Sequence, residues 1–88
     1  MELQNWKAYK YVRFENDELK FTPLLLHGTT HKELAGTNKA ISAGTIMVFE
    51  NYFTYLTEGS MTLGLWSSMD DDKELIEKLT KRQFKKRN

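Results

Sequence analysis

The chain has 88 residues, a formal net charge of +1 and no cysteine. This length predicts a single domain with a thin core, and the absence of cysteine excludes disulfides and thiolate metal sites. The longest apolar run, residues 46–49, is far shorter than a membrane span, and the first residues lack the pattern of a signal peptide. We therefore expect a cytoplasmic protein with no membrane association.

The first predicted element is a strand over residues 6–14, which are rich in aromatic and β-branched side chains. Asn16-Asp17 then supplies a two-residue turn, because both side chains tolerate the left-handed conformation. Residues 19–21 alternate apolar and polar and predict the returning strand. Pro23 ends that strand or places it at the edge of a sheet, since proline cannot donate a hydrogen bond.

Both histidines lie in the next segment, residues 26–36, together with two glycines and two threonines. Thr30 and Glu33 form a capping-box pattern, and Gly36 is a typical residue at the end of a helix. The pattern predicts a single helical turn over residues 30–35. Residues 37–39 are expected to form a loop.

An antiparallel meander is predicted next, with strands at residues 44–49, 52–57 and 60–66. The turns between them are Glu50-Asn51 and Glu58-Gly59. The first of these strands is apolar on both faces, which predicts a central position or a partner on one face.

A helix is predicted from residue 68, with Ser67 or Ser68 as its cap. Leu75, Ile76 and Leu79 form its apolar stripe, and Glu74–Lys78 and Glu77–Lys81 are spaced as ion pairs. The fold class is thus α+β: a small antiparallel sheet of four or five short strands with one C-terminal helix. Residues 1–84 should form one domain, and residues 85–88 a basic, frayed tail.

The candidate binding residues lie in three polar segments that we expect to meet at one end of the sheet. They are His27, Thr29, Thr30, His31, Glu33, Ser42, Thr45, Ser60 and Thr62. The two histidines have i, i+4 spacing, but Gly28 and the threonines between them favour a loop, which makes a poor metal cage. We therefore expect no metal and no cofactor. No enzyme motif covers these residues, so a binding role is favoured over an enzymatic one.

The leading hypothesis is a small non-enzymatic binding module that occupies a protein partner or sequesters a small anionic ligand. In general character the chain is similar to the small single-domain proteins that bacteriophages and mobile elements encode. The apolar strand and the eleven aromatic residues also predict a homo-oligomer.

The alternative is a nucleic-acid-binding regulator with a basic and aromatic strand face and a basic C-terminus. Its residues would be Lys7, Tyr9, Tyr11, Arg13, Lys81, Arg82, Lys85, Lys86 and Arg87. A small hydrolase with a histidine base is the third hypothesis.

Overall fold

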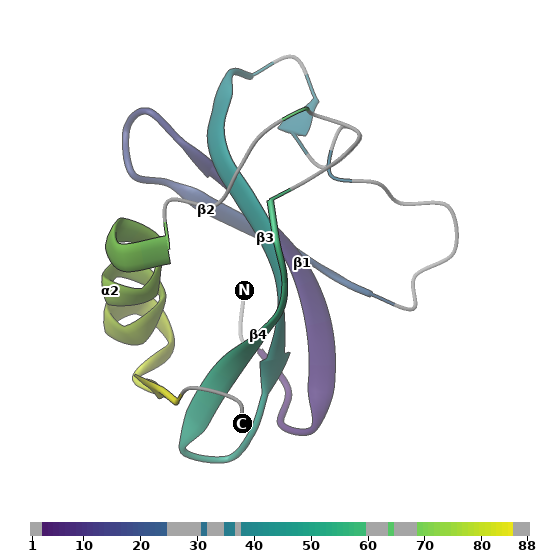
Figure 1. Ribbon diagram of the computed structural model, residues 1–88, viewed down its shortest axis with the longest axis vertical. Helices are drawn as coiled ribbons and strands as arrows, with labels where there is room; N and C mark the ends of the chain where they lie inside the picture. The colour runs from purple at the N-terminus through teal and green to yellow at the C-terminus, as the bar shows by residue number, and fades with distance from the viewer. Residues whose placement is uncertain are drawn as a thin grey trace.

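The computed structural model describes residues 3–24, 31, 35–36, 38–59, 64 and 69–85. These residues form a five-stranded, mostly antiparallel sheet and one C-terminal helix, so the predicted α+β fold is confirmed (Figure 1). The elements are β1 (Lys7–Phe14), β2 (Leu19–Pro23), β3 (Ala40–Val48), β4 (Tyr52–Glu58), α2 (Met69–Thr80) and β5 (Gln83–Phe84).

The first two strands form the predicted hairpin, but its loop has three residues, 15–17, and not the predicted two, because Phe14 N bonds to the Glu18 carbonyl. Asp17 has a φ of 62°, and the Asn16 side-chain oxygen accepts a hydrogen bond from Glu18 N at 3.1 Å. Both residue types suit this turn, because their short polar side chains stabilise left-handed or tight backbone conformations. Pro23 is the last residue of β2, and β2 is an edge strand, as expected for proline.

The strand order is β2-β1-β3-β4-β5, which makes β3 the central strand. β3 begins at Ala40, four residues before the predicted start, because residues 40–43 continue the pairing with β1. The predicted third strand of the meander, residues 60–66, lies outside the described residues apart from Gly64. The neighbour of β4 in the described sheet is instead β5, which pairs with it in parallel.

The main core lies between one face of the sheet and α2 (Figure 1), and Leu3 belongs to it. It includes Tyr9 and Tyr11 from β1, Ile46 from β3, Phe53 from β4 and Ile76 from α2, all of them buried. Pairing places these strand residues on a shared face, since side chains two positions apart point the same way.

The opposite face of the sheet carries a second, smaller apolar cluster. Val12, Phe14 and Ala43 are buried there against Ala35. His31 also packs close to the sheet, with its Nε2 2.7 Å from the Gly44 carbonyl oxygen. The remainder of the predicted helical turn at 30–35 lies outside the described residues.

The helix begins close to its predicted start, but its apolar stripe is narrower than expected. Ile76 is fully buried, whereas Leu79 is 57% exposed. Neither predicted helical ion pair occurs among the described residues, whose ion pairs are Arg13–Asp72 and Lys39–Glu15. The Glu77 carboxylate instead accepts a hydrogen bond from Phe84 N at 2.8 Å, because β5 folds back beside the helix.

The sequence did not predict β5. Phe84 packs against Phe53 and Tyr55 and holds the chain beside β4. Lys85 N then donates to the Phe53 carbonyl at 2.9 Å. Ordered backbone pairing therefore continues through Lys85, where the frayed tail was expected to begin, because an aromatic anchor precedes it.

Candidate functional site

The most unusual feature of the core is a carboxylate with no exposed surface. Asp72 lies in the first turn of α2 and is buried against the sheet. Its Oδ2 accepts hydrogen bonds from Tyr11 Oη at 2.6 Å and from Ser42 Oγ. A buried charge needs such partners, because an unpaired carboxylate away from water costs several kcal/mol.

A second tyrosine extends this network across the sheet. Tyr55 Oη lies 3.0 Å from Tyr11 Oη, and Tyr11 has only one proton, which it donates to Asp72. Tyr55 is therefore the donor to Tyr11. Burial raises the pKa of Tyr11 far above its usual value, and the neighbouring Tyr55 and Asp72 add to that shift. Tyr11 thus stays protonated and serves as a donor to Asp72.

Arg13 supplies the positive charge that balances Asp72. Its Nη1 lies 3.2 Å from Asp72 Oδ1, which is close enough for an ion pair but not aligned as a hydrogen bond. Arg13 Nε is also buried without a hydrogen-bond partner among the described residues. A guanidinium has five N–H donors, so this side chain keeps unused donor capacity.

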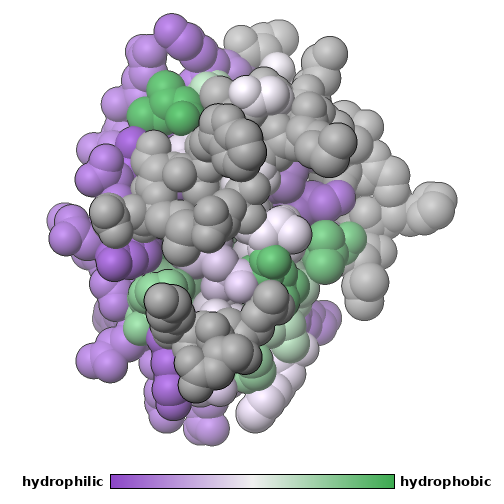
Figure 2. All heavy atoms as spheres, viewed as in Figure 1, coloured by the Kyte–Doolittle hydropathy of each residue, from purple (hydrophilic) through white to green (hydrophobic). Residues whose placement is uncertain are grey.

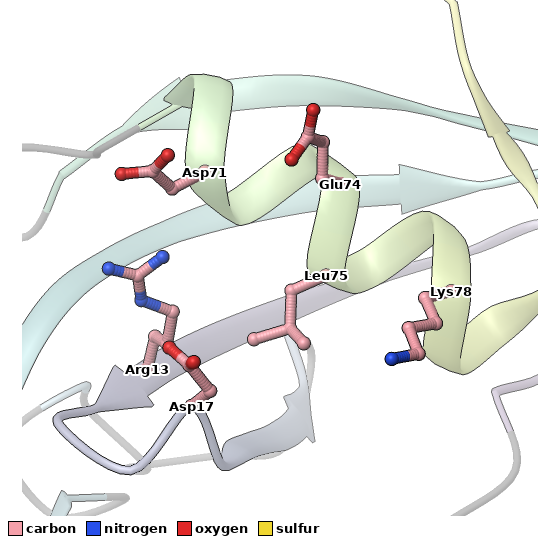
Figure 3. Close-up of a pocket in the computed structure, with 6 residues that line it drawn as sticks. All are labelled: Arg13, Asp17, Asp71, Glu74, Leu75 and Lys78. Carbon is pink, nitrogen blue, oxygen red and sulfur yellow. The ribbon is translucent and has the colours of Figure 1, made fainter.

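A pocket of about 350 Å³ opens beside this guanidinium, between the β1–β2 hairpin and α2. Arg13 and Asp17 line it from the hairpin side. From α2 come Leu75 and Lys78, which reach toward the hairpin, with Asp71 and Glu74 on the rim (Figure 3). The pocket therefore combines three carboxylates with two cations, one of which is already paired with Asp72. Figure 2 shows hydrophilic surface along the same side of the molecule.

Two described residues of the predicted polar segments, His31 and Gly59, contact the backbone of β3. His31 Nε2 is bonded to the Gly44 carbonyl, and Gly59 N donates to Ala43 O at 2.9 Å. However, His31, Ser42 and Thr45 are all buried. Ser42 contacts Asp72 beneath α2, while Thr45 belongs to the opposite face of the sheet. The other candidates, His27, Thr29, Thr30, Glu33, Ser60 and Thr62, lie outside the described residues.

The face proposed for nucleic-acid stacking is covered. Tyr9 is 2% exposed and Tyr11 is fully buried under α2, so neither ring offers a surface to a base. Arg13 is paired with Asp72. The burial follows from the parity of β1, because its tyrosine-bearing face is the one that packs on the helix.

The basic residues of the nucleic-acid hypothesis differ in their exposure to solvent. Lys7, Lys81 and Lys85 are exposed, whereas Arg82 is half-buried and hydrogen-bonds to Phe49 O, Leu3 O and Asn5 Oδ1. Lys86 and Arg87 lie outside the described residues.

Sequence reasoning missed the pocket and its buried ion pair. One available signal was the i, i+4 spacing of Asp72 and Ile76, which puts a carboxylate on the apolar face of the helix. The other was the shared parity of Arg13 with Tyr9 and Tyr11. An arginine on a buried strand face requires an acidic partner.

No cluster of three or more potential metal ligands occurs within the described parts of the chain. Helix α2, which is polar and 12 residues long, cannot span a bilayer, and the search of the described residues finds no other candidate span. Comparison with protein-family models, curated proteins and solved structures gives no match.

Proposed function

We propose that this protein is a small non-enzymatic binding module and that the pocket between the β1–β2 hairpin and α2 is its ligand site. The observation that carries the proposal is the pocket lining, which places the cations Arg13 and Lys78 beside the carboxylates of Asp17, Asp71 and Glu74. A concave site with a few convergent polar groups is the usual form of a small-ligand pocket.

The two walls of the pocket are held together before any ligand binds. Asp72 joins α2 to β1 through Tyr11 and Arg13 and to β3 through Ser42. A wall fixed in this way loses little conformational entropy on binding, which favours affinity in a small domain. The buried network thus supports recognition through pocket shape.

The charges of the pocket favour a ligand with groups of both signs. Arg13 and Lys78 can donate to a carboxylate or carbonyl oxygen, and Asp17 and Asp71 can accept from an ammonium group. A purely anionic ligand, the kind expected from the sequence, would meet three carboxylates. The proposed ligand chemistry is a primary amine joined to a carboxylate or carbonyl group, either a free amino acid or a lysine-containing segment of a protein partner.

Chemical-shift titration by NMR tests this proposal with three small probes and one peptide. L-lysine carries both groups, whereas cadaverine lacks the carboxylate and glutarate lacks the amine. L-lysine should bind at least fivefold more tightly than either single-function probe, with shifts at Asp17, Leu75 and Lys78. A short lysine-containing peptide that binds more tightly than free lysine would indicate the protein partner as the source.

Two pocket variants and one control sharpen the experiment. Asp17→Asn keeps a residue that tolerates the φ of 62° at this turn, and it removes one carboxylate. Lys78→Gln removes the cation that α2 contributes to the pocket. Each should weaken L-lysine binding several-fold, whereas Glu50→Gln, an exposed acid in the β3–β4 turn, should not. Equal binding by all three variants, or equal binding of the three probes, would contradict the proposal.

A further inference from the structure

A row of aromatic side chains with basic neighbours lies at the end of β1 that is far from the pocket. Trp6 is 67% exposed, and its ring packs edge-on against Phe49 with a centroid distance of 5.2 Å. Phe49 stacks on Tyr52 at 4.6 Å, and the Lys85 ammonium lies 5.0 Å from the centre of the Tyr52 ring. We propose that this row, Trp6–Phe49–Tyr52, is a binding surface for single-stranded nucleic acid.

Trp6 also has an unusual backbone conformation. Its φ is 65°, in a region that residues other than glycine rarely adopt. Trp6 N donates to the Val48 carbonyl at 2.7 Å, which fixes this residue at the start of β1. Such strain persists where the surrounding structure enforces it, often at a binding site. The backbone of Trp6 is thus fixed, while most of its side chain is exposed.

Positive charge gathers around the same row. Arg82 Nε donates to the Phe49 carbonyl, and its Nη2 contacts Asn5 Oδ1 and Leu3 O. Lys7 follows Trp6 in the chain, and Lys81 precedes Arg82; both are exposed. The tertiary structure thus brings Lys81, Arg82 and Lys85 to the end of the sheet that holds the β3–β4 turn (Figure 1).

Charge decides which partner this surface fits. Four cations, Lys7, Lys81, Arg82 and Lys85, neighbour this row in the chain or by contact. The acids beside them are Glu50, which follows Phe49, and Glu77, whose carboxylate accepts a hydrogen bond from Phe84 N. A two-fold dimer through this surface would place like charges against each other. Single-stranded nucleic acid supplies phosphates for the cations and bases that stack on aromatic rings. In a duplex the bases are already stacked on one another, so fewer base faces are available to the aromatic rings.

Fluorescence anisotropy of a labelled 20-nucleotide oligothymidylate at low salt tests this assignment. The wild-type protein should bind it and should prefer it to a duplex of equal length. Trp6→Ala should weaken binding by about 5- to 100-fold, the range expected for the loss of one stacked base. Trp6→Phe should recover part of the affinity. The matched control is Leu79→Ala, which removes a large exposed apolar side chain from α2 and should leave binding unchanged.

The salt dependence gives an independent readout. Lys85→Ala should make the slope of log affinity against log salt shallower by ~0.7, the value for one phosphate contact on a single strand. Lys39→Ala, an exposed lysine paired with Glu15, should not change it. The proposal fails if the wild type does not bind the oligonucleotide, or if Trp6→Ala and Leu79→Ala bind equally. It also fails if sedimentation shows a dimer that Trp6→Ala dissociates, since the row would then be the self-association surface.

Discussion

At the scale of single residues, the molecule depends on one buried carboxylate. Asp72 joins α2 to β1 and β3. Its carboxylate accepts hydrogen bonds from two hydroxyl groups and forms an ion pair with Arg13. Such a group adds little net stability compared with a well-packed apolar residue, but removing one partner leaves the others unpaired and buried. This asymmetry makes Asp72 a sensitive position for mutation.

We expect Asp72→Asn to lower the free energy of unfolding by about 3–5 kcal/mol, because Arg13 would keep a buried charge without compensation. Asparagine has nearly the same size, so the loss would not come from a cavity. The control is Asp71→Asn at the exposed neighbouring position, which should change stability by less than ~0.5 kcal/mol. Urea unfolding at pH 7 measures the stability of both variants. Similar losses of stability in the two would argue against a special role for Asp72.

The second residue prediction concerns pH. Burial lowers the pKa of His31, and nearby Lys10 adds to this shift, although the hydrogen bond to the Gly44 carbonyl opposes it. The folded protein therefore binds a proton less readily than the unfolded chain, whose histidine titrates near 6.5. Stability should be full above about pH 6.5 and should fall as the pH drops below it. The loss at pH 5.5 is at most ~1.4 kcal/mol.

Urea unfolding at pH 7.5 and pH 5.5 checks this expectation. His31→Gln keeps a side chain that can donate to Gly44 O but removes the titrating group, so the loss of stability between the two pH values should largely disappear. His27→Gln removes the other histidine and should retain the loss. If His27→Gln abolishes the pH dependence and His31→Gln preserves it, the assignment to His31 is wrong.

At the scale of elements, α2 is held by a narrow contact. Ile76 is fully buried in the main core, one turn beyond Asp72, whereas Leu79 points largely to solvent. Asp72 and Ile76, on successive turns, are the fully buried side chains among those that the structure describes on this helix. Polar contacts at its N-terminal turn complement a short apolar contact further along.

Ile76→Ala should consequently cost about 2–5 kcal/mol, as for other buried aliphatic truncations. Leu79→Ala, a matched change three residues later on the same helix, should alter stability by less than ~0.5 kcal/mol. Thermal unfolding followed by circular dichroism compares the two variants directly. Equal losses would mean that Leu79 is covered in solution.

At the scale of the whole molecule, the two ends of the chain close the fold together. Arg82 bonds to Leu3 O and Asn5 Oδ1, while Phe84 and Lys85 pair along β4. Leu3 is itself buried in the main core. Each contact between the two ends contributes a noticeable share of the free energy of unfolding, because that total is only about 5–15 kcal/mol in a domain of this size.

A chain that ends at Lys81 should therefore be less stable by at least ~2 kcal/mol than one that ends at Lys85. The shorter chain loses the aromatic contacts of Phe84 and the three carbonyl and amide contacts of Arg82. Chemical denaturation of the two truncated chains measures the difference. If they unfold at the same denaturant concentration, β5 does not contribute to stability.

The sequence by itself determined the local features. Alternation and turn chemistry predicted the β1–β2 hairpin, the positions of β3 and β4 and the C-terminal helix, because these depend on residues close together in the chain. Tertiary structure decided which faces are buried. The alternation in β1 separated two faces correctly, but it could not say which one α2 would cover, and so it could not predict that Tyr9 and Tyr11 would be inaccessible.

The candidate sites depended on the tertiary structure for the same reason. Arg13 and Asp72, or Trp6 and Lys85, are far apart in sequence, and only the folded chain brings each pair together. β5 escaped prediction because its two residues carry no periodic signal, and Phe84 becomes an anchor only when β4 supplies Phe53 and Tyr55 as neighbours. Local patterns fix element type, whereas sites arise from contacts between distant residues, which a single sequence does not encode in any short pattern.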